Sequence, residues 1–148
     1  MPRHLLNRLL LPSALLIPLL EQGIAIESQR RAWEALRPER YQFEYRMDCF
    51  CMLKGIRWRV TVQANSVLRV EALDTIGVNL RGNDFLFLHP TIDKLFADLT
   101  SDAKGPRSRI TVTFDSHWHY PSSIFADPDT IADDDAWGVQ VGNLVALK

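Results

Sequence analysis

The stretch from Tyr41 to Met52 constrains the fold more than any other part of the chain. Its odd positions, up to Cys51, are apolar or cysteine, and its even positions from Gln42 to Asp48 are polar or charged. A period of two places these two groups of side chains on opposite faces of a β-strand. The stretch therefore predicts a strand with one buried and one exposed face. It also carries both cysteines of the chain, one residue apart.

Two more alternating segments follow and predict an antiparallel meander. After a turn at residues 54–55, the even positions of residues 56–63 are apolar. Residues 64–66 suit a tight hairpin turn, because the asparagine in this segment tolerates left-handed backbone angles. The third strand has apolar residues at every second position, namely Leu68, Val70 and Ala72. Three strands that are joined by short turns and share one apolar face indicate an antiparallel sheet packed on a core.

Two helices and three further strands complete the predicted fold. Ser28 suits the cap of a first helix that ends before Pro38, and Thr91 suits the cap of a second helix with apolar residues at helical spacing up to Ala103. Residues 74–89 are predicted to form a loop. The further strands are predicted at residues 110–115, 123–126 and 137–141. We therefore predict an α+β fold, an antiparallel β-sheet of five to six strands with two helices packed on one face, in the order α-β-β-β-α-β-β-β.

The first 25 residues are typical of a secretory signal peptide. Arg3 and Arg8 form a short basic region, residues 9–20 form an apolar region, and residues 23–25 place small side chains at a cleavage position. The apolar region contains two prolines and is shorter than the roughly 20 residues that span a bilayer, which disfavours a membrane anchor. We expect cleavage of residues 1–25, a single domain over residues 26–148 without a stable membrane span, and export to the periplasm or the cell exterior.

Charge limits the classes of partner. The formal net charge of the chain is −1. A surface for nucleic acid or anionic membrane requires a clustered excess of basic residues, which this sequence lacks. The expected partners are therefore an envelope protein or a small ligand, and not a nucleic acid.

Several motifs together resemble a bacterial family of exported proteins catalogued as domain of unknown function 6174. They are Tyr41-x-Phe43-x-Tyr45, Cys49-Phe50-Cys51, Val60-x-Val62, and the segments 91–96, 112–115 and 120–124. The likeness spans residues 33–141, and its most specific part is the Cys-aromatic-Cys motif followed by an Asp and an aromatic-Pro turn. The resemblance implies export and brings no activity with it. In one departure, His119 stands before Tyr120 where the family pattern has glycine.

Cys49 and Cys51 are the first candidates for a chemical role. Two cysteines in an exported protein normally pair. Residues two apart in a regular strand have Cα atoms ~6.5 Å apart, near the upper limit for a disulfide, so closing the bond requires a bend. A staple that shapes the strand end, a redox pair, metal ligands and free buried thiols all remain open as roles for this pair.

Metal binding has two possible donor sets. Cys49 and Cys51 could combine with His117 and His119 into a tetrahedral zinc or copper(I) site, although neither spacing is a usual zinc signature. The alternative for the histidines is a pair of solvent-facing loop residues. The acidic segment 127–135 offers oxygens to calcium, but it lacks the glycine and terminal glutamate of a helix-loop-helix calcium site. A solvated acidic loop is the alternative there.

A loop with Trp118, Tyr120 and Pro121 is a candidate interaction loop, because such amphipathic side chains are enriched at interaction hot spots. In the alternative, Trp118 covers the end of the core. Ser122 and Ser123 follow, but the sequence has no Gly-x-Ser-x-Gly elbow, so a hydrolase is disfavoured. The sequence favours a non-enzymatic binding or accessory protein of the cell envelope that uses this loop or a sheet face. A metal- or redox-active protein that uses the Cys-x-Cys pair is the alternative.

Overall fold

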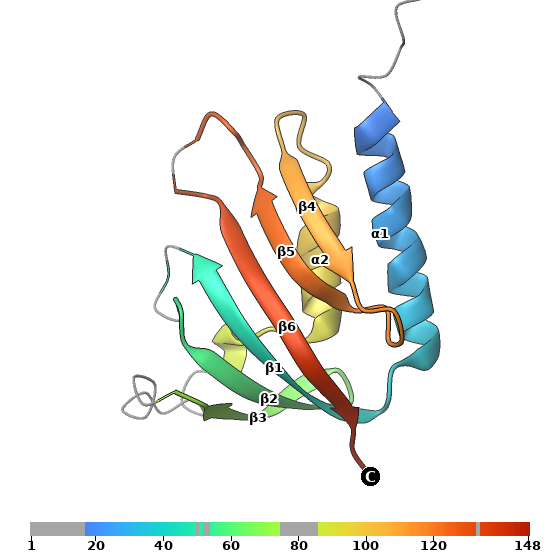
Figure 1. Ribbon diagram of the computed structural model, residues 1–148, viewed down its shortest axis with the longest axis vertical. Helices are drawn as coiled ribbons and strands as arrows, with labels where there is room; N and C mark the ends of the chain where they lie inside the picture. The colour runs from blue at the N-terminus through green and yellow to red at the C-terminus, as the bar shows by residue number, and fades with distance from the viewer. Residues whose placement is uncertain (1–16, 50, 52–53, 75–85, 133) are drawn as a thin grey trace, which may run out of the picture.

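Two helices and six strands make up the part of the chain that the structure, a computed structural model, describes: residues 17–49, 51, 54–74, 86–132 and 134–148. Their order is α-β-β-β-α-β-β-β, as predicted. Much of the loop predicted at residues 74–89 lies outside the described residues. The elements are α1 (Ile17–Leu36), β1 (Arg40–Cys49), β2 (Arg57–Gln63), β3 (Ser66–Ala72), α2 (Ile92–Asp102), β4 (Arg109–Phe114), β5 (Pro121–Asp127) and β6 (Trp137–Ala146) (Figure 1).

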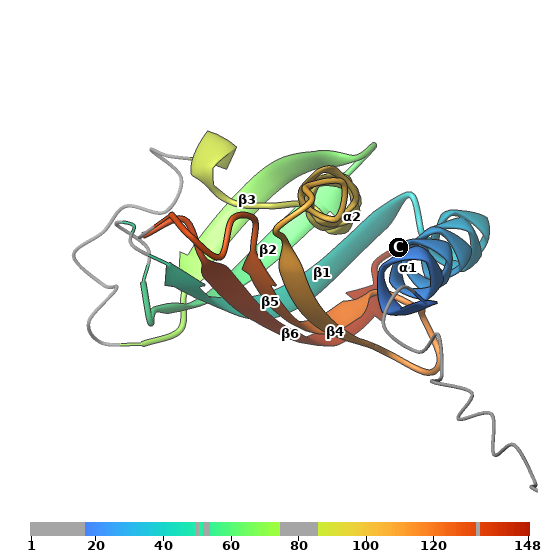
Figure 2. The ribbon, with the colours of Figure 1, turned by 90° about the horizontal axis from the view of Figure 1, so that it is seen from above.

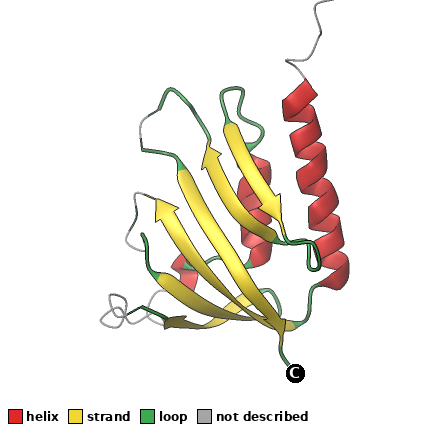
Figure 3. Ribbon diagram, viewed as in Figure 1, coloured by secondary structure: helices red, strands yellow, loops and turns green. Residues whose placement is uncertain are grey.

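The strands form one antiparallel sheet in the order β3-β2-β1-β6-β5-β4 (Figure 3). Two meanders, β1–β3 and β4–β6, meet where β1 pairs with β6 from Tyr41↔Ala146 to Cys49↔Trp137. The first and last strands therefore lie at the centre of the sheet. This pairing also explains why β6 continues to Ala146, beyond the predicted end at residue 141.

Both helices pack on one face of the sheet (Figure 2). Trp33 of α1 is fully buried, its ring lies 5.3 Å from that of Tyr41, and its Nε1 donates a 3.3 Å hydrogen bond to Asp93 of α2. The predicted cap at Ser28 is wrong, because α1 begins at least as early as Ile17 and passes through this position.

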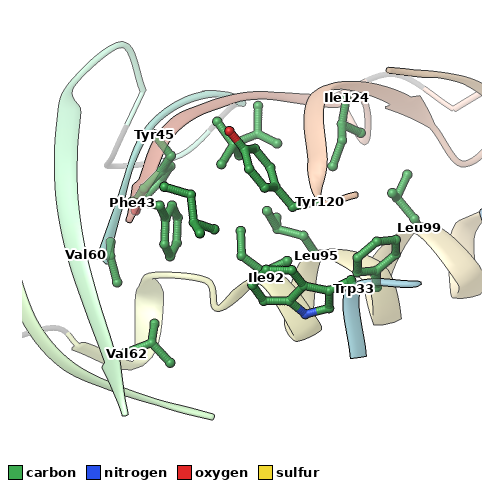
Figure 4. Packing of buried hydrophobic residues seen from close by; sticks show 14 of the residues in the cluster. Trp33, Phe43, Tyr45, Val60, Val62, Ile92, Leu95, Leu99, Tyr120 and Ile124 are labelled. Carbon is green, nitrogen blue, oxygen red and sulfur yellow. The ribbon is translucent and has the colours of Figure 1, made fainter. Parts of the chain in front are cut away.

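The predicted cap of α2 is confirmed, and so is the alternation within β1, but the strand ends at Cys49, before the predicted end at Met52, and Cys51 is exposed. Tyr41, Phe43 and Tyr45 are all at most 2% exposed. Phe43 and Tyr45 face α2 across the core (Figure 4), and the hydroxyl oxygen of Tyr41 accepts a 3.4 Å hydrogen bond from the backbone N–H of Ile92. Thr91 accepts a 3.1 Å hydrogen bond from the backbone N–H of Lys94. The core therefore fills the space between one face of the sheet and the helices.

A bulge changes the predicted pattern of β3. The pairing passes from Thr61↔Arg69 to Val62↔Val67, so Leu68 is an extra residue without an opposite partner in the register. Leu68 is 50% exposed, whereas Val67 packs against the core. The prediction that Leu68 faces the core is therefore wrong, since one extra residue exchanges the two faces of a strand.

Candidate functional site

A groove of about 520 Å³ opens between α2 and the ends of β1 and β6. Its walls include the apolar side chains of Met47, Leu95 and Trp137. Trp137 is held in place because its Nε1 donates a 2.8 Å hydrogen bond to Asp102 of α2. The β6 wall of the groove is therefore fixed to α2, which forms the opposite wall.

The floor of the groove includes His89, which is 5% exposed. Its Nδ1 lies 2.5 Å from the hydroxyl oxygen of Tyr45, and its ring lies 4.7 Å from that of Trp58. Burial lowers the pKa of His89 to about 4, so the imidazole is neutral at neutral pH. Among the described residues, neither His89 Nε2 nor Trp58 Nε1 has a hydrogen-bond partner.

A disulfide lies beside this groove. Cys49 and Cys51 are joined, and their Cα atoms are 5.2 Å apart. Cys51 lies in an exposed bend just beyond β1, which is the bend that closing the pair requires. The sulfur of Cys51 is 3.8 Å from the sulfur of Met47, a groove residue. The cysteine pair is thus an immediate neighbour of the groove wall.

The structure does not bring the cysteine pair and the histidine pair together. His119 precedes β5, and its Nδ1 lies 2.9 Å from Gln29 Oε1 of α1. Cys49 pairs with Trp137, and Trp137 pairs with Ala126 at the far end of β5. The two pairs therefore lie at opposite ends of the sheet, and no described group of three or more His, Cys, Asp or Glu side chains is placed to hold a metal ion.

The acidic segment is organised by an arginine. Asp129 accepts hydrogen bonds of 2.9 and 2.7 Å from Arg107, and its Oδ1 also accepts from the backbone N–H of Ile131. These contacts lower the pKa of Asp129. Position 133 of this segment, for which calcium binding is the alternative to a solvated loop, lies outside the described residues.

The Trp118 loop folds onto the core. Asp115 Oδ1 accepts backbone hydrogen bonds of 2.9 Å from His117 and 2.6 Å from Trp118. Tyr120 is 4% exposed, Pro121 is buried, and Trp118 packs half-buried against the core. Tyr120 and Pro121 are therefore part of the core. Of the three residues of the predicted interaction loop, Trp118 is the one with an accessible surface.

Sequence reasoning missed the groove. His89 falls in a segment without periodicity, and Met47 and Trp137 read only as apolar strand positions. The one sequence signal is the pair of residues His89 and Pro90 directly before the capped helix, which marks a fixed turn and does not mark a binding site.

The fold is that of a small α+β domain with one sheet face covered by helices. Residues 25–146 match DUF6174, a family of unknown function, and the chain belongs to this family. The match confirms the resemblance seen in the sequence motifs. Searches of curated proteins and of solved structures gave no significant match.

No helix among the described residues is both long and apolar enough to cross a membrane.

Proposed function

We propose that this chain is an exported, non-enzymatic binding domain of the cell envelope whose groove takes a small, largely apolar ligand. The observation that carries the proposal is the groove between α2 and the β1 and β6 ends. Its volume of about 520 Å³ falls within the range of roughly 300–1,000 Å³ of small-molecule sites. Such sites combine apolar walls with a few polar groups, as Met47, Trp137 and His89 do here.

The shape of the groove favours a small ligand over a protein partner. A stable protein interface buries about 800 Å² on each side, which calls for a broad surface and not one hollow. The rim of the groove carries Lys94 and Asp98, which form an ion pair with each other. This pair is internally neutral, and Asp102, the other carboxylate of the lining, accepts the hydrogen bond from Trp137. The apolar wall supplies the binding energy.

The start of the family match supports export with cleavage near residue 25. Gly23 and Ala25 are exposed and Ile24 is 62% exposed, whereas Ile26 is 2% exposed. Ile26 is therefore the first fully buried residue among the described side chains of α1, although Gln22, ahead of the predicted cleavage position, is half-buried and donates a hydrogen bond to the backbone oxygen of Ile110. The family match begins at residue 25. Intact mass of the protein recovered from the periplasm tests this proposal. A mass that includes residues 1–25 would contradict it.

Binding of the uncharged dye Nile red tests the groove. Met47→Gln places a polar amide in the groove wall, and we expect about tenfold weaker dye binding, measured by fluorescence titration. Val145→Gln is the matched control, because Val145 is 49% exposed on β6 and does not line the groove. Urea unfolding of both variants checks that they are folded. Equal dye affinity for the wild type and both variants would overturn the proposal.

Thiol–disulfide exchange is a second candidate function, favoured by the exposure of Cys51. A thiolate of a partner dithiol attacks Cys51 Sγ, forms a mixed disulfide and releases the Cys49 thiolate. The second thiol of the partner then displaces Cys51, so the pair gains two electrons and the partner becomes a disulfide. In Cys49→Ser, the remaining Cys51 should form a mixed disulfide with oxidised glutathione faster than Cys49 does in Cys51→Ser. Equal rates would count against this function.

The proposed metal role has less support than the redox role. The four side chains of the zinc or copper prediction lie at two ends of the sheet, and Cys49 and Cys51 are joined to each other.

A further inference from the structure

Two arginines face each other on the sheet surface that the helices leave open. Arg46 of β1 is directly opposite Arg57 of β2 in the strand register. Both are exposed, while their neighbours Tyr45 and Trp58 point into the core. Like charges at directly opposite positions destabilise a sheet. The pair therefore has a charge that calls for a counter-ion.

The carboxylates nearby leave this charge partly unmatched. Asp74 accepts hydrogen bonds from the backbone N–H of Arg57 at 2.9 Å and from its Nε at 3.1 Å. The side chain of Arg46 makes no hydrogen bond or ion pair with any described residue, although its charge contributes to the lowered pKa of Asp74. Glu44 is already engaged by Arg59 at 2.8 Å and by Asn143 at 3.0 Å, and these two contacts lower the pKa of Glu44.

A hollow of about 270 Å³ lies beside the two arginines. Gly142 lines it, and a Cβ atom at that position would meet no atom within 4 Å beyond its chain neighbours, so the space above the backbone is open there. Gln140 lies opposite Arg46 in the pairing of β1 with β6, and its Nε2 donates a 2.9 Å hydrogen bond to Ser123. The hollow therefore combines open space with the donors of Arg46, Arg57 and Gln140. Glu44 also lines it, with its two carboxylate oxygens held by Arg59 and Asn143.

We propose that this hollow binds a phosphate group between Arg46 and Arg57. Guanidinium groups bind the oxygens of phosphate in pairs of parallel hydrogen bonds, and a bound anion removes the repulsion between the two side chains. The phosphate can be free in solution or can belong to a lipid headgroup. The site lies on the open face of the sheet, away from the groove and its ligand, so either proposal can fail without the other.

Titration of the full chain with inorganic phosphate at low ionic strength tests the site. Chemical shifts of the arginine Nε–H groups report binding, and we expect saturation in the millimolar range. Arg46→Gln should weaken binding about tenfold, as expected for the loss of one charge-assisted contact. Arg69→Gln is the matched control, because Arg69 lies on β3, is exposed, pairs with Glu71 and does not line the hollow. It should leave phosphate affinity unchanged.

Thermal unfolding adds a second measurement. Phosphate should raise the Tm of the wild type and of Arg69→Gln but not that of Arg46→Gln. Equal loss of affinity in both variants, or no saturation by phosphate, would overturn the proposal. Co-sedimentation with phosphatidylglycerol vesicles identifies the source of the phosphate. If the wild type binds the vesicles and Arg46→Gln does not, the phosphate belongs to a lipid headgroup. If the wild type is saturated by inorganic phosphate but does not bind the vesicles, the ligand is free phosphate.

Discussion

The hydroxyl oxygen of Tyr45 and Nδ1 of His89 lie 2.5 Å apart, and this hydrogen bond joins the centre of the sheet to the turn that precedes α2. Both side chains are buried, at 2% and 5% exposure. The bond fixes the floor of the groove relative to β1. It also places an imidazole in surroundings that oppose its protonation, because burial disfavours the charged form.

Stability should fall in mild acid because of His89. Burial lowers the pKa of His89 from 6.5 to about 4 in the folded protein. Below pH 6.5 this histidine binds a proton in the unfolded chain but stays neutral in the folded protein. The contribution of His89 to the free energy of unfolding is therefore complete at pH 7.5 and falls as the pH drops towards 4. The largest loss from this group is about 3 kcal/mol. Urea unfolding at pH 7.5, 5.5 and 4.5 measures it.

A non-titrating variant provides the control for this pH dependence. His89→Gln should be less stable at pH 7.5, yet its stability should change little between pH 6.5 and 4.5. Carboxyl groups with lowered pKa values, such as those of Glu44 and Asp74, lose their contribution only below about pH 4.5. A variant that loses as much stability as the wild type over this window would show that His89 is not responsible.

The disulfide should contribute little to global stability. Cys49 and Cys51 are two residues apart, so the bond closes a very small ring and removes little entropy from the unfolded chain. The chain-entropy relation gives about 1.6 kcal/mol for such a ring. The double variant Cys49→Ser/Cys51→Ser and the reduced wild type should therefore both lose less than about 2 kcal/mol in urea unfolding. A loss comparable to the whole stability would mean that the bond shapes more than the end of β1.

Local patterns were predictable because local burial produces them. The period of two in β1 and β2 follows from having one face on the core, and Thr91 caps α2 through its own side chain. The pairing of β1 with β6 was not predictable in this way. It places Tyr41 opposite Ala146, and no turn or spacing in a single sequence indicates a contact between residues so far apart in the chain. The start of α1 was missed because ion pairs of Arg30 with Glu27 and Glu34 continue the helix through Ser28.

The candidate site depended on such distant contacts. Met47, His89 and Trp137 come from three segments that meet only after the sheet has formed. The sequence identified Cys49 and Cys51 correctly as a pair, since their spacing is local. It could not place His119 relative to them, because that distance depends on the order of the strands.

Replacing His119 with glycine should stabilise the protein. His119 has a φ of +65°, a left-handed conformation that costs a non-glycine residue energy. We expect a gain of up to about 1 kcal/mol for His119→Gly in urea unfolding, reduced by the loss of the contact with Gln29. His119→Ala, which loses that contact and keeps the strain, should destabilise instead. Equal effects of both variants would contradict this account.

The bulge in β3 predicts opposite outcomes for two adjacent residues. Val67→Ser should cost about 1–2 kcal/mol, because Val67 packs against the core and serine leaves that contact unfilled. Leu68→Ser should change stability by less than about 0.5 kcal/mol, since Leu68 is 50% exposed. Urea unfolding of the pair measures both effects. A larger loss of stability for Leu68→Ser than for Val67→Ser would contradict the bulge and favour the regular register that the alternation in the sequence predicts.

Asp93 should be the most sensitive surface carboxylate, because it connects the two helices. It accepts a hydrogen bond from the indole N–H of buried Trp33 and pairs with Arg37, and it stands in the first turn of α2, where a negative charge is favourable. Asp93→Ala should cost about 2 kcal/mol, since it leaves the indole donor of Trp33 unsatisfied. Asp93→Asn keeps an acceptor and should cost about half of that. Asp98→Ala is the control, because it removes only the ion pair with Lys94 on the same helix, and it should cost less than about 0.5 kcal/mol. An equal loss of stability for Asp93→Ala and Asp98→Ala would show that α1 is held by its apolar contacts alone.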